Sequence, residues 1–165
     1  MVTTLDQTRG ENAHYWPVML PGTRRIVYFV RSTVPSNNGI YATNVDGSGT
    51  PIRLVSSLSS AVYAPAAGGG PGHLLWVRDG DLLAQQFDTG AAELVGPVST
   101  VAPNVRVEES QRGVFASVSS TGVLVWADAR AANAEFVLFD RNGKRLERLA
   151  VDEGALSSPA PGAGR

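Results

Sequence analysis

The apolar residues of this chain fall in short runs that are separated by polar and glycine-rich stretches. The three longest runs are IVYFV at 26–30, LLWV at 74–77 and VLVWA at 123–127. Runs of this length that are rich in β-branched and aromatic residues favour strands over helices. The segment EFVLFD at 135–140 is apolar on both faces, which is typical of a strand between two layers. No window shows the apolar stripe of an amphipathic helix, so the pattern predicts an all-β protein.

The same order of elements occurs three times along the chain. Each copy has a strand of small residues, a turn, an aromatic strand, a third strand, a second turn with glycine and a closing strand. The aromatic strands place Tyr28, Trp76 and Trp126 at equivalent positions, separated by 48 and 50 residues. Four strands in a period of about 40–50 residues are the pattern of β-propeller blades.

Short turns with positive-φ residue types separate these strands. The relevant segments are VDGSG at 45–49, RDGD at 78–81 and RNGK at 141–144. Asp-Gly and Asn-Gly pairs accept the positive φ angles of tight hairpin turns. The third strand of each copy ends near Asp46, Asp88 or Asp140, and a glycine follows shortly afterwards. The copies therefore read as antiparallel meanders of four strands.

The fold class expected from these patterns is an all-β propeller fragment with about three four-stranded antiparallel blades and the first strand of a fourth. The expected divisions are a lead-in at 1–13, blades at 14–60, 61–111 and 112–154, and the start of a truncated fourth blade at 155–165. Three blades do not close a ring, because propellers have four to eight. We therefore expect either self-association that completes the propeller, for example two copies in one six-bladed ring, or a poorly folded fragment.

Composition narrows the classes of function. The chain has 14 basic and 15 acidic residues, a net charge of −1, which argues against a nucleic-acid binder that uses a basic surface. The absence of cysteine excludes disulfides, cysteine-ligated metals and thiol catalysis. The sequence shows neither a secretory leader nor an apolar run long enough for a membrane helix. We therefore expect a soluble chain that does not insert into a membrane. The sequence does not indicate the cellular compartment.

Four phrases resemble a known repeat family. They are ENAHYWPVMLPG at 11–22, LLWVRDGDLLAQQFD at 74–88, SSTGVLVW at 119–126 and FDRNGK at 139–144. They are similar to TolB-type, WD-like β-propeller repeats, and more narrowly to the propeller regions found C-terminal to bacterial serine/threonine kinases. The first phrase departs from the family pattern, since the Asp usually found between the equivalents of Pro21 and Gly22 is missing.

The resemblance implies a non-catalytic propeller that serves as a sensor or protein-interaction module, extracytoplasmic in kinase-linked relatives. An alternative is the accessory propeller of a hydrolase or peptidase whose catalytic domain is absent here. A neighbouring kinase domain would favour the first function, and a neighbouring hydrolase segment with a serine elbow would favour the second.

Catalytic motifs are not expected in this chain. It has no kinase catalytic loop, and its single lysine, Lys144, falls in a turn. The serines in SSLSS at 56–60 have only His14 and His73 as conceivable bases, and we expect His14 to pack beside Trp16. We expect no enzyme activity, no cofactor and no metal site.

A partner, either a protein or a small polar ligand, is expected at charged loops. In propellers, ligands commonly meet the face built from the second-to-third-strand loops and the loops between blades. We assign the loops at 32–38, 106–112 and 127–133 to this face, and the short glycine turns, with Asp79–Gly80–Asp81 among them, to the opposite one. The candidate contact residues are Arg106, Glu108, Glu109, Arg112, Asp128 and Arg130.

Overall fold

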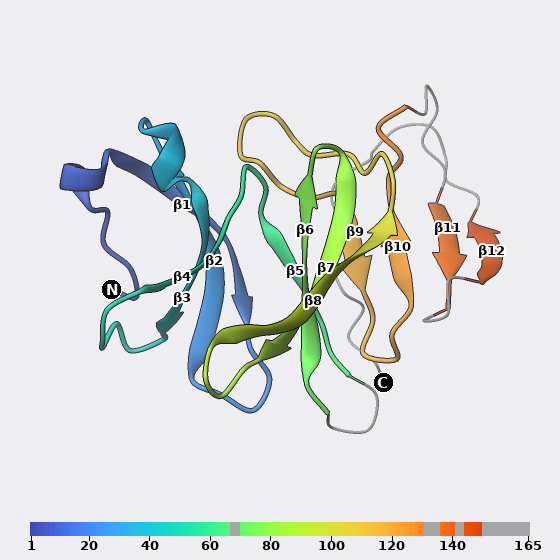
Figure 1. Cartoon of the computed structure of the whole chain (residues 1–165), viewed down its shortest axis with the longest axis horizontal. Helices are drawn as coiled ribbons and strands as arrows, with labels where there is room; N and C mark the ends of the chain where they lie inside the picture. Colours follow the sequence, from blue (N-terminus) through green and yellow to red (C-terminus); the bar gives the residue numbers. More distant parts are fainter. Residues whose placement is uncertain (67–69, 131–135, 141–143, 150–165) are drawn as a thin grey trace.

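The computed structural model contains three four-stranded antiparallel sheets in a row (Figure 1). It describes residues 1–66, 70–130, 136–140 and 144–149. The expected all-β fold with three four-stranded sheets is confirmed for this part of the chain. The fourth blade expected at 155–165 and the end of the third lie outside the described residues.

Each sheet follows the chain order without crossovers. The first sheet contains β1 (Glu11–Met19), β2 (Arg25–Ser32), β3 (Gly39–Asn44) and β4 (Ile52–Ser56). The second contains β5 (Ala61–Ala64), β6 (Gly72–Arg78), β7 (Asp81–Asp88) and β8 (Glu93–Ala102). The third contains β9 (Ala116–Val118), β10 (Leu124–Trp126), β11 (Phe136–Phe139) and β12 (Arg145–Leu149). Two single-turn 3-10 helices, η1 (Gln7–Arg9) and η2 (Pro35–Asn37), lie beside the first sheet.

The turn between β6 and β7 shows how local sequence sets the strand register. Arg78 pairs with Asp81, which leaves two residues in the loop. These residues, Asp79 and Gly80, have φ angles of 53° and 88°. Two positive φ angles are the requirement of a type I′ hairpin, and Asp-Gly is one of the pairs that tolerate them best. The hairpin expected from RDGD is therefore confirmed.

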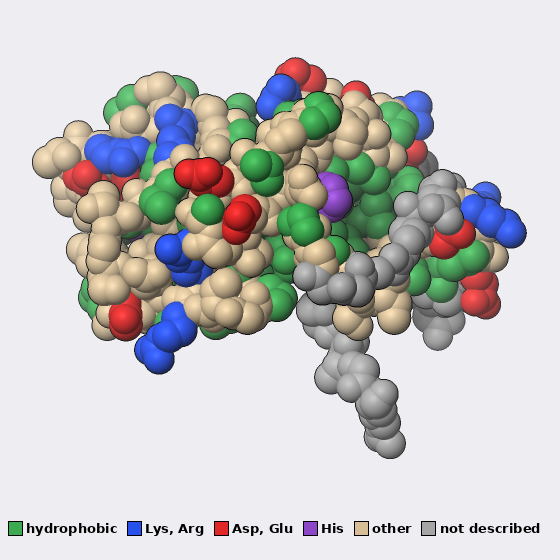
Figure 2. Space-filling view, turned by 60° about the horizontal axis from the view of Figure 1, so that its bottom comes forward, with side chains coloured by type: hydrophobic (Ala, Val, Ile, Leu, Met, Phe, Trp, Pro, Cys, Tyr) green, Lys and Arg blue, Asp and Glu red, His purple; other side chains and the backbone are tan. Residues whose placement is uncertain are grey.

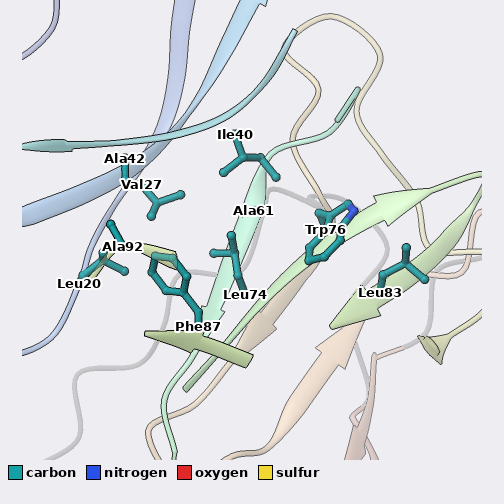
Figure 3. Close-up of a cluster of buried hydrophobic side chains, with 10 residues drawn as sticks. All are labelled: Leu20, Val27, Ile40, Ala42, Ala61, Leu74, Trp76, Leu83, Phe87 and Ala92. Carbon is teal, nitrogen blue, oxygen red and sulfur yellow. The ribbon is translucent and has the colours of Figure 1, made fainter. Parts of the chain in front are cut away.

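The sheets pack face to face, and the middle sheet is apolar on both sides. Leu74 and Trp76 of β6 join the core shared with the first sheet, whereas Leu75 and Val77 join the core shared with the third sheet. Strand side chains alternate between the two faces, so one apolar run supplies both cores. The first of these cores is drawn in Figure 3, where Trp76 and Phe87 lie among side chains from both sheets.

The equivalent aromatic residues share one orientation. Trp76 of the second sheet packs in the core with the first sheet, and Trp126 of the third sheet packs against the core with the second. Tyr28 of the first sheet belongs to a separate cluster on the side turned away from the second sheet. In each sheet the aromatic residue therefore faces the side of the preceding sheet.

Residues 1–10 run along the outer side of the first sheet, at the left of Figure 1. Arg9 contacts Tyr41 of β3 by a hydrogen bond and by its guanidinium, which lies 5.3 Å from the ring centroid. No helix among the described residues is long and apolar enough to cross a membrane.

Candidate functional site

Five connections gather at one end of the sheets, shown at the top of Figure 1, and we call this the loop end. They are the β2–β3 loop at 33–38, the β4–β5 connection at 57–60, the β6–β7 turn at 79–80, the β8–β9 loop at 103–115 and residues 127–130 after β10. Hydrogen bonds join the last four: the Ser60 amide donates to the Arg112 carbonyl at 2.7 Å, the Val105 amide to the Gly80 carbonyl at 2.7 Å and the Arg106 amide to the Ala127 carbonyl at 2.9 Å. The loop end is thus a connected surface.

The placement of Asp79–Gly80–Asp81 on the opposite face is wrong. This turn joins the second and third strands of its sheet, so topology places it with the β2–β3 loop and residues 127–130. The hydrogen bond from Val105 to Gly80 fixes it directly beneath the charged β8–β9 loop. The turn was assigned to the opposite end because it has only two residues, like the short turns there. The end of the sheet at which a connection lies depends on which strands it joins and not on its length.

The candidate residue Arg106 lies where the two charged loops meet. Its guanidinium carbon is 5.1 Å from the centroid of the Phe115 ring, and its carbonyl accepts the Phe115 amide at 3.0 Å. A guanidinium at this distance over an aromatic face gains electrostatic attraction from the ring. Arg106 is exposed, yet its side chain is held by this contact.

Glu108 has a role within its own loop. Its carboxylate accepts the Ser110 amide at 2.7 Å and the Gln111 amide at 2.5 Å. These hydrogen bonds, first that from Gln111 and then those from Ser110, hold the pKa of the Glu108 carboxyl below its usual value, because they favour the charged form. Glu108 therefore shapes the loop, and its carboxylate is already committed to two donors.

Trp16 fastens the same loop to the first sheet, a contact that sequence reasoning missed. Its Nε1 donates to the Gln111 carbonyl at 2.9 Å, and its ring covers Gly113, where an added Cβ would lie 2.5 Å from Cζ2. Arg31 of β2 adds a hydrogen bond to the Ser110 carbonyl at 2.8 Å. Trp16 has a φ of 55° at a break in the β1–β2 register, so strain in β1 turns the indole toward the loop.

The last two candidates pair with each other. Arg130 Nη2 lies 3.0 Å from Asp128 Oδ2, and the Arg130 amide donates to Oδ1 at 2.8 Å. The side-chain bond from Arg130, and then the amide bond, lower the pKa of Asp128. Because both side chains are solvent-exposed, this pair adds little to stability and is open to exchange with a partner.

Four charged side chains at the loop end make no hydrogen bond or salt bridge with any described residue. They are Glu109 and Arg112, which were expected, and Arg78 and Asp79, which were not. All four are exposed. Arg112 sits at a φ of 62°, and its carbonyl accepts the Ser60 amide at 2.7 Å, so its backbone is fixed. Its exposed charge lies near Glu108 and helps to lower the pKa of that carboxyl.

Three of the four serines at 56–60 that were considered as nucleophiles are structural. Ser57, Ser59 and Ser60 are buried in the connection between β4 and β5. The Ser59 hydroxyl accepts the Val77 amide at 2.9 Å, and the Ser60 hydroxyl accepts the Val114 amide at 3.0 Å. They link the first two sheets to the loop end and are not presented to a substrate.

His14 has Tyr28 as its ring neighbour, at a centroid distance of 5.0 Å, while Trp16 packs on the loop end. The His14 Nε2 lies 3.0 Å from an oxygen of the buried Glu11. This arrangement corrects the expected packing beside Trp16, because the irregular register after Tyr15 turns the two side chains apart.

A groove between the second and third sheets was also missed. It encloses about 660 Å³ and appears in Figure 2 as a green hollow with a purple histidine at its rim. Trp126 and Phe139 line it as a stacked pair, with ring centroids 4.5 Å apart, and His73 contributes a polar edge. Trp126 packs against the core between these two sheets and is half-buried.

Among the residues that the structure describes, no group of three or more His, Asp or Glu side chains is placed to hold a metal ion. Comparison of the chain with protein-family models and with curated proteins finds no match.

Proposed function

We propose that this chain is a non-catalytic β-propeller module that binds a protein or small polar partner at the loop end. It resembles the TolB-type, WD-like propellers attached to bacterial serine/threonine kinases, and we propose a sensor or interaction role of the same kind. The observation that carries the proposal is a set of unpaired charges on loops that the rest of the molecule holds in place.

The stacking of the sheets supports the propeller assignment. The three sheets follow one another face to face, and β5, the first strand of the middle sheet, contacts both β1 and β9. In a propeller the first strands of successive blades are likewise neighbours around the central axis. The resemblance of the four sequence phrases points the same way.

Preorganisation supports the assignment of the loop end. Trp16, Arg31 and Ser60 anchor the β8–β9 loop through hydrogen bonds to its backbone. A loop that is ordered before binding loses less conformational entropy when the partner arrives. Glu109 and Arg112 therefore offer exposed charges on an ordered loop, which suits recognition.

Backbone with a positive φ gathers at the same end. Five non-glycine residues in the described part of the chain have a positive φ, and Asp79, Asn104 and Arg112 lie on loop-end connections. Trp16, a fourth, packs against the β8–β9 loop. Asp and Asn tolerate this region, so the strain falls on Trp16 and Arg112, whose conformations cost free energy of the kind that tends to cluster where a surface has a binding role.

The charge pattern indicates the kind of partner. Arg78 and Arg112 are basic whereas Asp79 and Glu109 are acidic, so the charges of these four side chains balance and do not favour phosphates. Mixed fixed charges match a partner with its own mixed charges, and such pairs associate faster at low salt.

The test uses the purified chain as bait for proteins from its source cells, with a charge-reversed variant beside the wild type. The variant carries Glu109→Lys and Arg112→Glu, which keep the net charge and leave the two amide donors of Glu108 in place. A bound protein, once identified and purified, should bind the variant at least about tenfold more weakly, with a slower on-rate, because the complementary charges are lost.

The matched control is Glu93→Lys with Arg24→Glu, two exposed charges outside the loop end. This control should bind like the wild type, and both variants should melt like the wild type. Equal binding by the wild type and the loop-end variant would contradict the proposal. Phosphate transfer or ester hydrolysis by the purified chain would overturn the non-catalytic assignment.

A further inference from the structure

The outer side of the first sheet has the character of an interface between sheets. It carries Ile26, Tyr28, Val30 and Tyr41, which form a buried cluster separate from the two cores between sheets. Within the described part of the chain, no sheet lies on this side (Figure 1). We propose that this surface, the Tyr28 face, docks the third sheet of a second copy of the chain, and that residues 1–10 cover it in the monomer.

The repeated orientation of the aromatic residues carries the argument. Trp76 packs toward the first sheet and Trp126 toward the second, so the equivalent side chain always meets the preceding sheet. Tyr28 occupies the same position in the first sheet and points to the side where a preceding sheet would stand. The Tyr28 face is therefore the receiving side of an interface that the chain already builds twice.

The third sheet supplies the complementary surface. Leu124 and Trp126 pack toward the middle sheet, so alternation along β10 places Val125 on the far side. Leu124 pairs with Phe139, which lines the same groove as Trp126, so Leu138 also falls on the far side. We call this surface the Val125 face. In the middle sheet, Leu75 and its pairing partner Ala84 hold the corresponding positions and belong to the core with the next sheet.

Residues 1–10 hold their place mainly through polar contacts. Arg9 bonds the Tyr41 hydroxyl and lies 3.7 Å from the Glu11 carboxylate. The other Glu11 oxygen accepts the Asp6 amide at 2.9 Å, so the same buried acid fixes two points of the segment. These contacts can be exchanged for water, unlike the broad apolar contacts between the sheets.

The cover is also incomplete. A groove of about 420 Å³ that opens to solvent remains between residues 1–10 and the sheet, and Val2, Ile26 and Tyr28 are among its lining residues. Met19 at its edge is 58% exposed. Apolar side chains therefore stay in contact with water here, and a docked sheet would bury them.

The proposed contact joins different faces of two copies, so it is heterologous. It rests on the proposed propeller fold, and two copies joined at both pairs of faces would give six sheets, within the usual range of four to eight blades. Residues 1–10 then regulate assembly, because only molecules with an uncovered Tyr28 face are competent to dock.

The test measures molar mass by light scattering across a range of protein concentrations, with the full chain throughout. Arg9→Ala removes the contacts with Tyr41 and Glu11 and should lower the dimer dissociation constant about tenfold. Arg24→Ala, which removes an exposed arginine from the β1–β2 turn, should leave the constant unchanged. A folded Arg9→Ala variant that stays monomeric at every concentration would overturn the proposal.

A second substitution tests the partner face. Val125→Glu in the Arg9→Ala background should restore the monomer, since it places a charge in the apolar contact. Val95→Glu, which changes an exposed valine on the outer strand β8, is the matched control and should leave the dimer intact. Association that survives Val125→Glu would show that another surface is used and would contradict the proposal.

The loop-end variant Glu109→Lys/Arg112→Glu separates this proposal from the proposed function. It should dimerise in the Arg9→Ala background like the parent, although it loses its partner. If it loses the dimer instead, the copies meet at the loop end, the docking proposal fails and the loop end is still an interaction site. If the dimer forms but no loop-end partner binds, the docking proposal stands without the partner-binding function.

Discussion

The ionisation of a single side chain in this protein depends on its surroundings in the fold. Tyr28 is an example, because desolvation on the outer face, and then the nearby Glu11 charge, raise the pKa of its hydroxyl to about 12. Its ring is buried, but no described residue hydrogen-bonds its hydroxyl. The side chain thus stays neutral where free tyrosine would ionise.

We expect Tyr28 to make the fold sensitive to alkali. Tyrosine in the unfolded chain ionises near pH 10, so between about pH 10 and 12 only the unfolded state loses this proton. The contribution of Tyr28 to stability is therefore complete below about pH 10 and is lost as the pH rises toward 12. Tyr28→Phe should match the wild type near pH 7 and unfold at higher pH, as followed by denaturation at a series of pH values.

The absorbance of tyrosinate provides an independent check. The wild type should show a late titration component that Tyr28→Phe lacks. An unchanged alkaline midpoint in the variant would mean that Tyr28 ionises normally in the folded protein.

At the scale of elements, the strands could be predicted from the sequence, but the contacts between residues far apart in the sequence could not. The runs around Tyr28, Trp76 and Trp126 identify β2, β6 and β10, because apolar β-branched residues and Asp-Gly turns act over a few neighbouring positions. Trp16 and Gln111 are 95 positions apart, and no local sequence pattern predicts the hydrogen bond between them.

The candidate site was predictable to a similar degree. Charge density along the chain locates Arg106, Glu109 and Arg112, since loops between sheets are surface segments. Charge density does not show which charged side chains already have hydrogen-bond partners. Glu108 is an example, because its carboxylate accepts amides of its own loop. The exposed Arg78 was overlooked because it ends a strand and lies apart from the charged segments.

Gly113 is the position where the β8–β9 loop has least room. An added Cβ would lie 2.5 Å from Trp16 Cζ2, so Gly113→Ala should displace the indole and destabilise the protein by about 1–3 kcal/mol. Urea denaturation gives this value. In a Trp16→Ala background the same change should cost much less, and equal costs in both backgrounds would show that the two residues are not coupled.

Ser59 should be the most sensitive serine in the connection between the first two sheets. Ser59→Ala leaves the buried Val77 amide without its partner, at an expected cost of about 1–3 kcal/mol. Ser56→Ala is the control, since that residue is exposed and its change should cost under about 0.5 kcal/mol. Equal stability of the two variants by chemical denaturation would contradict the structural role of Ser59.

In the molecule as a whole, burial is uneven across the three sheets. The first two sheets share a core that includes Leu74, Trp76 and Phe87, each at most 1% exposed. Among the described side chains of β9–β12, only Ala116 is buried. Elements with few buried apolar contacts open at lower free energy than the core, so the third sheet is the weakest part of the described fold.

Unfolding should therefore proceed in two steps, with the third sheet first. Far-ultraviolet circular dichroism in increasing urea should begin to change before the first two sheets open. Leu83→Ala, in the shared core, should shift the second step by about 2–5 kcal/mol and leave the first nearly unchanged. A single transition with all probes coincident would show that the three sheets unfold as one unit.

The three tryptophans give this behaviour a built-in optical readout. Trp16, Trp76 and Trp126 lie one in each sheet, and their surroundings differ. The Trp16 indole N–H bonds a carbonyl, the Trp76 N–H is buried without a described partner, and the Trp126 ring is stacked on Phe139. Pairwise replacement of the others by phenylalanine would leave a single emitter in a chosen sheet, so fluorescence could time the opening of each sheet separately without any attached dye.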